Sequence, residues 1–564
     1  MTPRTARPPQ VPLGSRAALD DGPRRFDVVV IGGGINGAGI ARAAARAGLR
    51  VCLFEKYDFG WGTTWRSTKL IHGGLRYLEH GELGLVFESL HDQALLLREY
   101  PDMVRPLSLL LPIYRGARRG VTTIGLGLTI YDLLARGRHL PGHRRLAAGT
   151  ALAMEPALRA RGLTAAFTYS DSQIAFPERL CIQTLLEAAE AGAVCLNRAE
   201  VTGIQRHNGR VAGVTVRDDL LHRHVEVGAR VVVNASGPWV DELLATLSTR
   251  PRRQLGGTRG AHVVVDYAGR GPLHGLYAEA RSDRRPFFIV PWRGRHLIGT
   301  TDTRYAGPPE AAAATRADVD YLLSEANALL PGAPLVDGAV EYAYAGVRPL
   351  PASTGGAEGS VTRRHLIRDH ADSGYDGLFS IIGGKLSTYR SLADDVLRQI
   401  GRYVWPTPSQ EAPRPRHETP AAQEAAAETR WLLQRAGPAI ADHLRATYGP
   451  RLHALAALTH RQPALIEPLC PHGPDLVGQV VLAARTEAAH GVADVLLRRL
   501  SSGWNICLGL DCAERVATLL GMEHGWSAER VTQQAAAYVA EVRATFFTPG
   551  RALDAAPVPA RSIV

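Results

Sequence analysis

Hydrophobic and polar positions follow two different spacings near the start of the chain. Phe26–Ile31 is a short run rich in β-branched residues, and Asn36–Ala47 is an alanine-rich stretch with the spacing of a helix. Gly48 ends the helix pattern, and Arg50–Phe54 is a second apolar run of strand length. Together these segments predict a βαβ unit.

The alternation of strand and helix patterns continues to about residue 400 and then changes. A proline-rich, polar stretch follows, and beyond it apolar residues recur at the i, i+3 and i+4 spacing of helices. Further strands are predicted at Val211–Val216, Arg230–Asn234, Ala261–Asp266 and Phe287–Val290. We divide the chain into a disordered leader (1–25), an α/β region (26–404), a linker (405–424), a helical domain (425–547) and a loose tail (548–564).

Composition narrows the class of protein. The 564 residues are too many for one ordinary core, and 45% apolar with 21% charged residues excludes wholesale disorder. No apolar run reaches the ~20 residues of a membrane-spanning helix, and the N-terminal residues lack the apolar core of a secretory signal. The six cysteines form no C-x-x-C pair, so we expect a reducing cytosol, no disulfide scaffold and no metal site.

The basic residues are unusually uniform. Of the 65 lysines and arginines, only Lys56, Lys69 and Lys385 are lysines. Lysine carries a compact ammonium and arginine a broad planar fork, so a tight pocket distinguishes them. The three lysines therefore mark candidate sites, with chance retention as the alternative.

A glycine-rich loop joins the first predicted strand to the first helix. Gly32, Gly34 and Gly37 form G-x-G-x-x-G, a turn whose backbone amides and helix N-terminus bind a pyrophosphate. Glu55 ends the second strand, where a carboxylate binds a ribose diol. A purely structural turn does not explain the three glycines together with the acid, so the segment predicts one dinucleotide site.

Several longer motifs carry a resemblance to a known family. They are I-G-G-G-I-N-G-A-G-I at 31–40, S-T-K-L-I-H-G-G-L-R-Y-L-E at 67–79, V-N-A-S-G-P-W at 233–239, I-G-T-T-D-T at 298–303, A-G-V-R-P-L at 345–350 and I-G-G-K-L-S-T-Y-R at 382–390. In this order, across about residues 26–530, the chain closely resembles the FAD-dependent glycerol-3-phosphate dehydrogenases. The segment V-A-D-V-L-L-R-R at 492–499 resembles the cap domain of that family.

The resemblance implies a fold and a cofactor. The fold class is α/β, with a Rossmann-like FAD-binding domain interleaved with a sheet-rich substrate domain and followed by an all-α cap domain. FAD is the implied cofactor. The residues implied to bind it are Gly32, Gly34, Asn36, Gly37, Glu55, Ser67, Lys69, Gly237, Gly383, Gly384 and Thr388.

The resemblance also implies a reaction. The expected chemistry oxidises sn-glycerol 3-phosphate to dihydroxyacetone phosphate by hydride transfer to FAD, and electrons then pass to a membrane quinone. The alternative is a soluble oxidase that reduces oxygen to hydrogen peroxide. A third hypothesis, a catalytically silent protein that binds nucleic acid or a metabolite, has no recognition motif or aromatic series to support it, so we expect no nucleic-acid partner.

The substrate calls for fixed cations around its phosphate and for a proton acceptor at its hydroxyl. His72 is the candidate base, with a flavin contact as its alternative role, and Arg348 is the candidate that stabilises the developing alkoxide. The expected substrate-binding residues are Arg76, Tyr77, Arg363 and Lys385.

Two segments depart from the family pattern. Phe176 and Pro177 occupy a region where the family commonly has acidic residues, which puts the wall of the substrate pocket in question. Trp65 and Arg66 are bulkier than the residues usual beside the flavin loop, which predicts different packing there.

The net charge of +11 fits a membrane-surface partner, because a quinone is dissolved in lipid. We expect a cytoplasmic protein peripherally associated with the cytoplasmic membrane, and a homodimer is compatible with the sequence. The alternative for the basic residues is an ordinary solvated face. The candidate basic patch, interleaved with leucine and isoleucine, comprises Arg115, Arg118, Arg119, Arg136, Arg138, Arg144 and Arg145.

Overall fold

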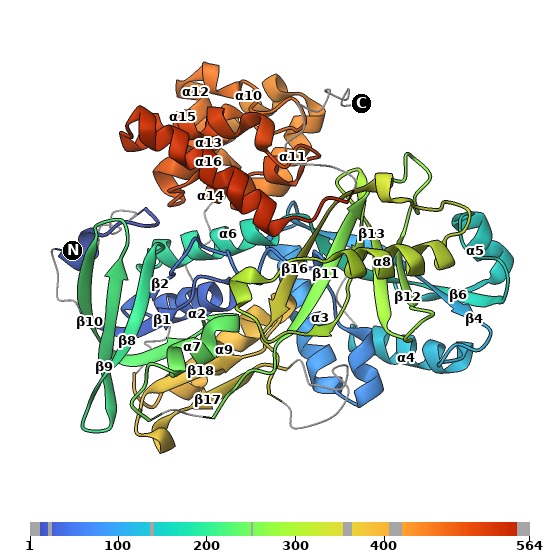
Figure 1. The fold of residues 1–564 in the computed structure, drawn as a ribbon, viewed down its shortest axis with the longest axis horizontal. Coiled ribbons are helices and arrows are strands. Elements are labelled where there is room, and N and C mark those ends of the chain that lie inside the picture. Colours follow the sequence, from blue (N-terminus) through green and yellow to red (C-terminus); the bar gives the residue numbers. More distant parts are fainter. Residues whose placement is uncertain are drawn as a thin grey trace.

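Two β-sheets and a C-terminal group of helices organise the chain in the computed structural model (Figure 1). The structure describes residues 12–20, 25–135, 140–249, 252–352, 364–404 and 420–549. Residues 136–139, 353–363 and 405–419, which include Arg136, Arg138 and Arg363, lie outside the described part, as does most of the expected tail.

The first sheet has eight strands and a parallel centre in the order β18-β10-β1-β2-β7. Helix α2 (Ile35–Arg46) connects β1 to the parallel strand β2, which confirms the predicted βαβ unit. The helix also contacts α6 (Pro177–Glu190) and α9 (Tyr389–Ile400). A hairpin of β8 and β9 continues antiparallel from β10. The strands are β1 (Arg25–Ile31), β2 (Val51–Phe54), β7 (Val194–Leu196), β8 (Ala199–His207), β9 (Arg210–Asp218), β10 (Arg223–Asn234), β17 (Leu366–Asp369) and β18 (Leu378–Ile382).

The second sheet has ten strands and is mainly antiparallel. Its segments lie between strands of the first sheet along the chain, so the two sheets are interleaved in sequence as expected. Its strands are β3 (Leu70–Ile71), β4 (Val104–Tyr114), β5 (Arg144–Ala147), β6 (Leu163–Ile174), β11 (Thr258–Val265), β12 (Gly275–Glu279), β13 (Pro286–Trp292), β14 (Arg295–Gly299), β15 (Thr303–Arg304) and β16 (Val340–Arg348). The accompanying helices are α3 (Leu83–Glu99), α4 (Val121–Leu134), α5 (Ala148–Met154) and α8 (Arg316–Leu329), whereas α7 (Val240–Leu244) packs against β8 and β18 of the first sheet.

The C-terminal helices gather on one side of the two sheets, at the top of Figure 1 in orange and red. The fold class, α/β with a helical C-terminal domain, is therefore confirmed. The first of these helices begins at residue 420, inside the segment expected to be a linker. They are α10 (Pro420–Ala436), α11 (Pro438–Tyr448), α12 (Leu452–Arg461), α13 (Val477–Thr486), α14 (Val492–Arg498), α15 (Ala513–His524) and α16 (Ala528–Thr545).

Part of the expected disordered leader is packed against the fold. Residues 12–20, which include the short helix α1 (Ala17–Asp20), bury Leu13 and Leu19 in separate hydrophobic clusters. The Arg16 guanidinium donates to the Asp218 carboxylate at 2.9 Å and to the Asn197 carbonyl at 2.7 Å. The prolines and arginines of the leader suggested disorder, but two leucines and one buried ion pair outweigh them here.

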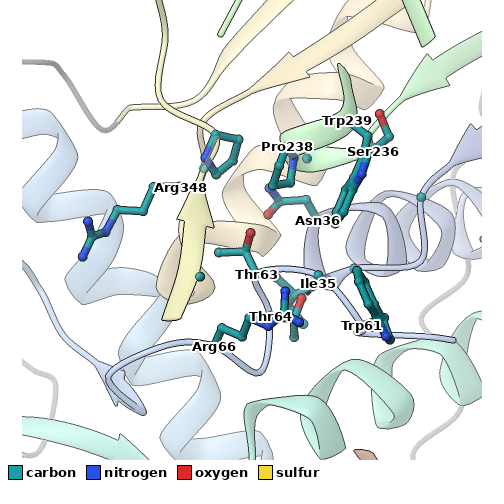
Figure 2. Close-up of a pocket in the computed structure, with 18 of the residues that line it drawn as sticks. Ile35, Asn36, Trp61, Thr63, Thr64, Arg66, Ser236, Pro238, Trp239 and Arg348 are labelled. Carbon is teal, nitrogen blue, oxygen red and sulfur yellow. Dashed lines mark hydrogen bonds between the residues drawn. The ribbon is translucent and has the colours of Figure 1, made fainter. Parts of the chain in front are cut away.

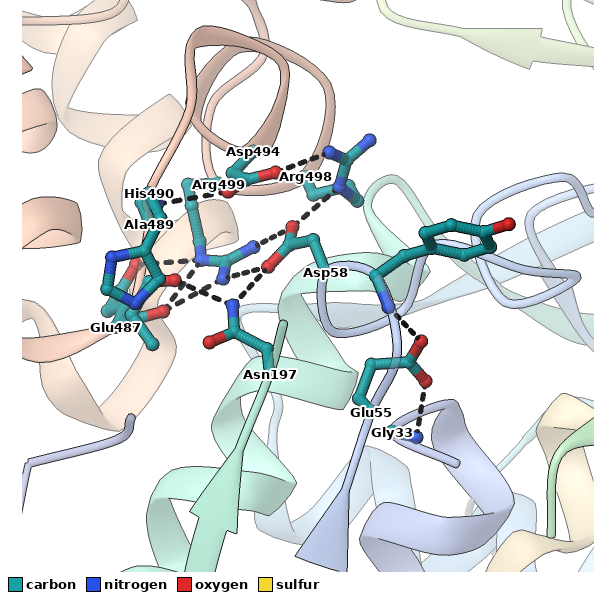
Figure 3. Close-up of polar contacts among 12 residues, drawn as sticks. Gly33, Glu55, Asp58, Asn197, Glu487, Ala489, His490, Asp494, Arg498 and Arg499 are labelled. Carbon is teal, nitrogen blue, oxygen red and sulfur yellow. Dashed lines mark hydrogen bonds and ion pairs between the residues drawn. The ribbon is translucent and has the colours of Figure 1, made fainter. Parts of the chain in front are cut away.

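A buried ionic network joins the helical domain to the loop that follows β2 (Figure 3). Asp58 lies in that loop, and its carboxylate accepts hydrogen bonds from Arg498 Nε at 2.6 Å and from both Nη atoms of Arg499. Arg498 also binds Asp494 at 2.8 Å. In the described part of the chain, none of the helices combines the length and the apolar character needed to span a bilayer.

Candidate active site

A cavity of about 530 Å³ lies at the carboxyl ends of β1, β2 and β10, where parallel α/β sheets bind their ligands. Its walls include the glycine-rich loop and residues 61–68, 235–239, 346–350 and 383–387, together with single residues from other segments. Figure 2 shows Asn36, Thr64, Arg66 and Trp239 around this space. Five of the six longer motifs that carried the family resemblance therefore contribute to one cavity, all but the segment 298–303.

The glycine-rich loop makes an open turn at the head of α2. Gly32 has a φ of +109°, a conformation that side chains rarely adopt, and a Cβ at Gly37 would clash with the Gly32 carbonyl. Gly34 precedes the helix without a capping side chain, and the Ile35 amide donates to Thr64 Oγ1 at 3.1 Å. The positive end of the α2 dipole therefore faces the cavity, as an anion-binding site requires.

Glu55 lies where the sequence predicted the ribose acid. Its two carboxylate oxygens accept hydrogen bonds from the amides of Gly33 at 2.7 Å and Tyr57 at 2.8 Å. Burial raises the pKa of Glu55, although these two amides oppose the shift. Each carboxylate oxygen has a second lone pair, so the group retains acceptor capacity for a diol.

Two buried polar atoms on the cavity wall test the fit of a dinucleotide. Asn36 Oδ1 and Arg66 Nε are both buried without a hydrogen-bond partner in the described structure. The Arg66 guanidinium lies 4.9 Å from the ring centre of Trp61 and 4.7 Å from that of Trp65, and burial lowers its pKa to about 10. Beside the open turn, Asn36 Oδ1 is thus available to accept a hydrogen bond from the adenosine or flavin part of a dinucleotide. The Arg66 guanidinium is available to bind its phosphate. The residues present fit FAD.

A second cavity, of about 1110 Å³, adjoins the first. Thr68, His72, Tyr77 and Arg348 line both of them. These four residues come from the segment around β3 and from the end of β16. Three of them were candidate site residues from the sequence, and their meeting point is the candidate place for substrate.

Arg348 ends β16, and its guanidinium is held by the loop between β14 and β15. It donates to Asp302 Oδ1 at 2.8 Å and to Thr300 Oγ1 at 2.8 Å. A Cβ on Gly260 would clash with the guanidinium, so this glycine of β11 leaves the space that the arginine fills. The fork is therefore fixed in orientation before any ligand arrives.

Tyr77 and Lys385 are in direct contact on the wall of the first cavity. Lys385 Nζ lies 3.6 Å from the centre of the Tyr77 ring and 3.5 Å from Ser89 Oγ. Tyr77 belongs to the 3-10 helix Leu75–His80, and Lys385 precedes the 3-10 helix Leu386–Thr388. Asn36 Nδ2 donates to the Gly383 carbonyl at 3.4 Å and so links the glycine-rich loop to the Lys385 segment.

His72 is followed by a backbone amide that the fold holds in place. The Gly73 amide donates to Asp171 Oδ1 at 3.0 Å, and this oxygen also accepts from Tyr131 Oη at 2.8 Å and from Gln93 Nε2 at 3.0 Å. Burial raises the pKa of Asp171 to about 6, against these three hydrogen bonds. Asp171 therefore fixes the loop that carries His72.

Two further residues of the site have no counterpart among our sequence predictions. They are His262 of β11 and Thr68. Both line the first cavity, and a hydrogen bond of 2.9 Å joins His262 Nε2 to Thr68 Oγ1. Burial, with the charges of Arg348 and Lys69, lowers the pKa of His262 well below its usual value, so its imidazole is neutral. One signal in the sequence was available, because His262 interrupts the apolar run G-A-H-V-V-V.

Some expected site residues lie away from the cavities. Lys69 is fully buried, donates to the Trp65 carbonyl at 2.6 Å and pairs with Glu178 at 3.6 Å. Burial lowers the pKa of Lys69 to about 8. Gly37 and Thr388 line neither cavity, and neither do Phe176 and Pro177 of the segment that departs from the family pattern. The side chain of Arg76 is outside the described part, so its place is not assigned.

Comparisons with known proteins match both halves of the chain. A protein-family model for FAD dependent oxidoreductases matches residues 27–390, and one for the C-terminal domain of alpha-glycerophosphate oxidase matches residues 411–531. The glycerol-3-phosphate dehydrogenase of Synechocystis is 38% identical over 530 residues, covering 91% of this chain and 95% of that protein. Glycerol-3-phosphate dehydrogenase 2 of Mycobacterium tuberculosis is 34% identical over 537 residues, covering 93% and 89%.

Solved structures agree with these matches. The crystal structure of a glycerol-3-phosphate dehydrogenase from Bacillus halodurans, complexed with FAD, superposes with a TM-score of 0.73 at 27% identity and covers 94% of this chain and 96% of that one. An L-alpha-glycerophosphate oxidase of Mycoplasma pneumoniae shares the fold at a TM-score of 0.52 and 17% identity, covering 67% and 95%. The chain is an FAD-dependent oxidoreductase, and it belongs to the glycerol-3-phosphate dehydrogenase family.

Proposed function

We propose that this enzyme oxidises sn-glycerol 3-phosphate to dihydroxyacetone phosphate and passes the electrons to a membrane quinone. The observation that carries the proposal is the meeting of His72, Tyr77 and Arg348 where the FAD-type cavity adjoins a larger one. The names of the relatives at 34–38% identity supply the substrate class.

Cations near this junction support recognition of a phosphorylated alcohol. Lys385 offers a compact ammonium for the phosphate beside the Tyr77 ring, and the guanidinium of Arg348 is a second, fixed cation at the junction. Lysine binds phosphate as a point charge. The carboxylate of Asp302, which pairs with Arg348 now, keeps the guanidinium oriented.

Oxidation at carbon 2 removes a hydride from the carbon and a proton from the hydroxyl group. FAD, when bound, accepts the hydride. We assign the proton to the imidazole of His72, whose loop is held by Asp171. Positioned proton transfer of this kind accelerates reactions by about 10²–10⁴-fold. Arg348 stabilises the negative charge that develops on the hydroxyl oxygen.

The second cavity supports a quinone as acceptor over oxygen. It extends from the junction residues to Ile124, Leu126 and Ile130 of α4, and Leu126 is 63% exposed. Charged residues such as Arg118 and Arg119 line the same cavity, but these apolar side chains of α4 suit a lipid-soluble acceptor, whereas oxygen needs no such route. Exposed Phe87 and Leu133, on the contacting helices α3 and α4, extend this apolar face beside the exposed arginines Arg115 and Arg118.

The acceptor is tested by steady-state turnover with glycerol 3-phosphate. A soluble quinone in anaerobic buffer is compared with air-saturated buffer that lacks quinone, where oxygen uptake and hydrogen peroxide are measured. The proposal predicts fast turnover with quinone and slow peroxide formation. Equal or faster turnover with oxygen would favour the oxidase alternative.

A further inference from the structure

A carboxyl group and an imidazole near Lys385 face each other without a hydrogen bond between them. Glu88 lies on α3, and His365 lies just before β17. Glu88 Oε1 is 3.8 Å from His365 Nδ1, and both atoms are buried with no hydrogen-bond partner in the described part of the chain. Buried polar atoms are normally paired, so this contact needs an explanation.

Two elements connect the Glu88–His365 pair to Lys385. Ser89, the residue after Glu88, has its hydroxyl oxygen 3.5 Å from Lys385 Nζ. Strand β17 pairs with β18, which leads into Gly383 and Lys385, and a Cβ on Gly383 would lie 3.8 Å from His365 Cα. The charge of Lys385 acts on both members of the pair. The pair therefore lies within electrostatic reach of the candidate phosphate site.

The second ring nitrogen of His365 shows where the imidazole carries its proton. His365 Nε2 lies 2.8 Å from Asp395 Oδ2, and the Arg398 guanidinium pairs with the other oxygen of that carboxylate. The Asp395 carboxylate is therefore an acceptor, and Nε2 donates to it. A neutral imidazole then has a lone pair on Nδ1, and an ionised Glu88 presents only lone pairs. The two facing atoms repel unless one proton lies between them.

That proton belongs on the carboxyl group. Burial raises the pKa of Glu88 and lowers that of His365, so a neutral Glu88 that donates to Nδ1 is favoured over an ion pair. The other acid on this side of α3, Asp92, already has donors, because its two oxygens accept from the Ser391 amide at 3.1 Å and from the Ser391 hydroxyl at 2.9 Å. Glu88 therefore differs from Asp92 in needing a proton.

The remaining charges around the pair come from three elements. They are Asp92 on α3, Asp395 and Arg398 on α9, and Arg364 and Lys385 in the segments on either side of the β17–β18 hairpin. Among these groups, Lys385 is the one that lines the first cavity. A change of charge on the pair therefore reaches the cavity through Lys385.

We propose that Glu88 and His365 are positioning residues that set, through their shared proton, how strongly Lys385 binds the phosphate of the substrate. This inference rests on the proposed oxidation of glycerol 3-phosphate. With the proton present the pair is neutral, and the Lys385 ammonium contributes its full charge to the phosphate. Without it, the Glu88 carboxylate attracts the ammonium toward α3 and repels the dianion. Because linkage is reciprocal, phosphate binding favours uptake of the proton.

The test is the pH dependence of KM and kcat for glycerol 3-phosphate, measured with the FAD-loaded enzyme from neutral to alkaline pH. As the pair loses its proton, the KM of wild type should rise by at least about fivefold relative to that of Glu88→Gln, with little change in kcat. The glutamine is neutral at every pH, and its amide donates to Nδ1, so this variant keeps the low KM. The ratio of the two KM values at each pH cancels the titration of the substrate itself.

Glu99→Gln is the matched control. Glu99 is an exposed residue at the end of α3 and pairs with Arg390 of α9, so this variant also removes a carboxylate between the two helices. Its KM should follow the pH dependence of wild type. The same pH dependence of KM in wild type and Glu88→Gln would overturn the inference, even if both enzymes oxidise glycerol 3-phosphate.

Calorimetry provides a second measurement that needs no variant. Binding of dihydroxyacetone phosphate, the expected product, is measured in two buffers of different ionisation enthalpy, over the pH range where this ligand is already a dianion. We expect wild type to take up a proton on binding, and no uptake at any pH in this range would overturn the inference. A wild-type protein that does not reduce FAD with glycerol 3-phosphate would instead overturn the proposed function, and this inference with it.

Discussion

The carboxylate of Asp58 accepts two hydrogen bonds from the Arg499 guanidinium, at 2.8 and 2.9 Å, with both side chains fully buried (Figure 3). Asp58 follows Tyr57, whose amide donates to Glu55, the expected ribose acid. The loop that follows this expected cofactor contact is therefore held by the helical domain across 441 residues of sequence. We expect the two domains to stabilise one another and FAD.

Removing the charge of Asp58 tests this coupling. Asp58→Asn leaves Arg498 and Arg499 without their shared buried carboxylate, and breaking such a pair costs about 3–5 kcal/mol. We expect a lower free energy of unfolding and a weaker FAD affinity, measured by denaturant titration and by flavin fluorescence. Asp320→Asn, which breaks an exposed pair with Arg316, should change both by little. An Asp58→Asn protein as stable as wild type would contradict the coupling.

The sequence was sufficient for features that depend on neighbouring residues. The βαβ unit, the open turn at Gly32 and the carboxylate at Glu55 follow from short segments, and the structure has each of them in the expected position. The site residues His72, Arg348 and Lys385 were reached through the family resemblance, and they line the first cavity.

Other features depend on strands that are distant in the sequence. Asp171 on β6 fixes the His72 loop, and His262 on β11 binds Thr68, so neither role was visible before the strands were assembled. Lys69 illustrates the same limit. It occupies a tight buried pocket, as a retained lysine suggested, but Trp65, Glu178 and Trp504 form that pocket, and the cavity does not include it.

Asp171 makes the stability of the fold depend on pH. Its folded-state pKa of about 6 lies above that of an unfolded aspartate, about 3.9, so the folded state binds more protons between these values. The contribution of this carboxyl to stability is therefore present below about pH 4 and lost as the pH rises through about 6.

Asp171→Asn removes this titration. We compare the free energies of unfolding of the variant and wild type. Their difference should change in favour of the variant by up to about 3 kcal/mol as the pH rises from about 4 to about 6, and it should be constant above pH 6. Denaturant titrations at a series of pH values measure the difference. A difference that does not vary with pH would show that Asp171 does not titrate in this window.

Lys385 is expected to need its compact ammonium. Lys385→Arg keeps the charge, but a planar fork does not fit between the Tyr77 ring, 3.6 Å away, and Ser89. We expect at least about a tenfold loss of kcat/KM for glycerol 3-phosphate, equivalent to about 1.4 kcal/mol. Lys56→Arg, measured at saturating FAD, is the control and should retain most of the activity. Equal activity of the Lys385→Arg enzyme and wild type would remove Lys385 from the phosphate site.

The exposed apolar face of α3 and α4 is expected to bind anionic membranes. Phe87→Gln combined with Leu133→Gln removes two half-exposed side chains from this face. We expect reduced co-sedimentation with anionic phospholipid vesicles and normal turnover with a soluble acceptor. Leu273→Gln, at a side chain that is 80% exposed elsewhere, serves as the control. Unchanged vesicle binding by the double variant would exclude this face as the membrane contact.

Anaerobic mixing of the FAD-loaded enzyme with sn-glycerol 3-phosphate tests the central proposal most directly, because the visible absorbance of the flavin reports hydride transfer alone. Wild type should bleach rapidly with glycerol 3-phosphate and not with glycerol, which lacks the phosphate. Arg348→Ala should remain yellow with FAD bound and bleach about 10²–10³-fold more slowly. A wild-type protein that stays yellow with glycerol 3-phosphate would contradict the assignment of substrate, and rapid bleaching of Arg348→Ala would remove Arg348 from the site.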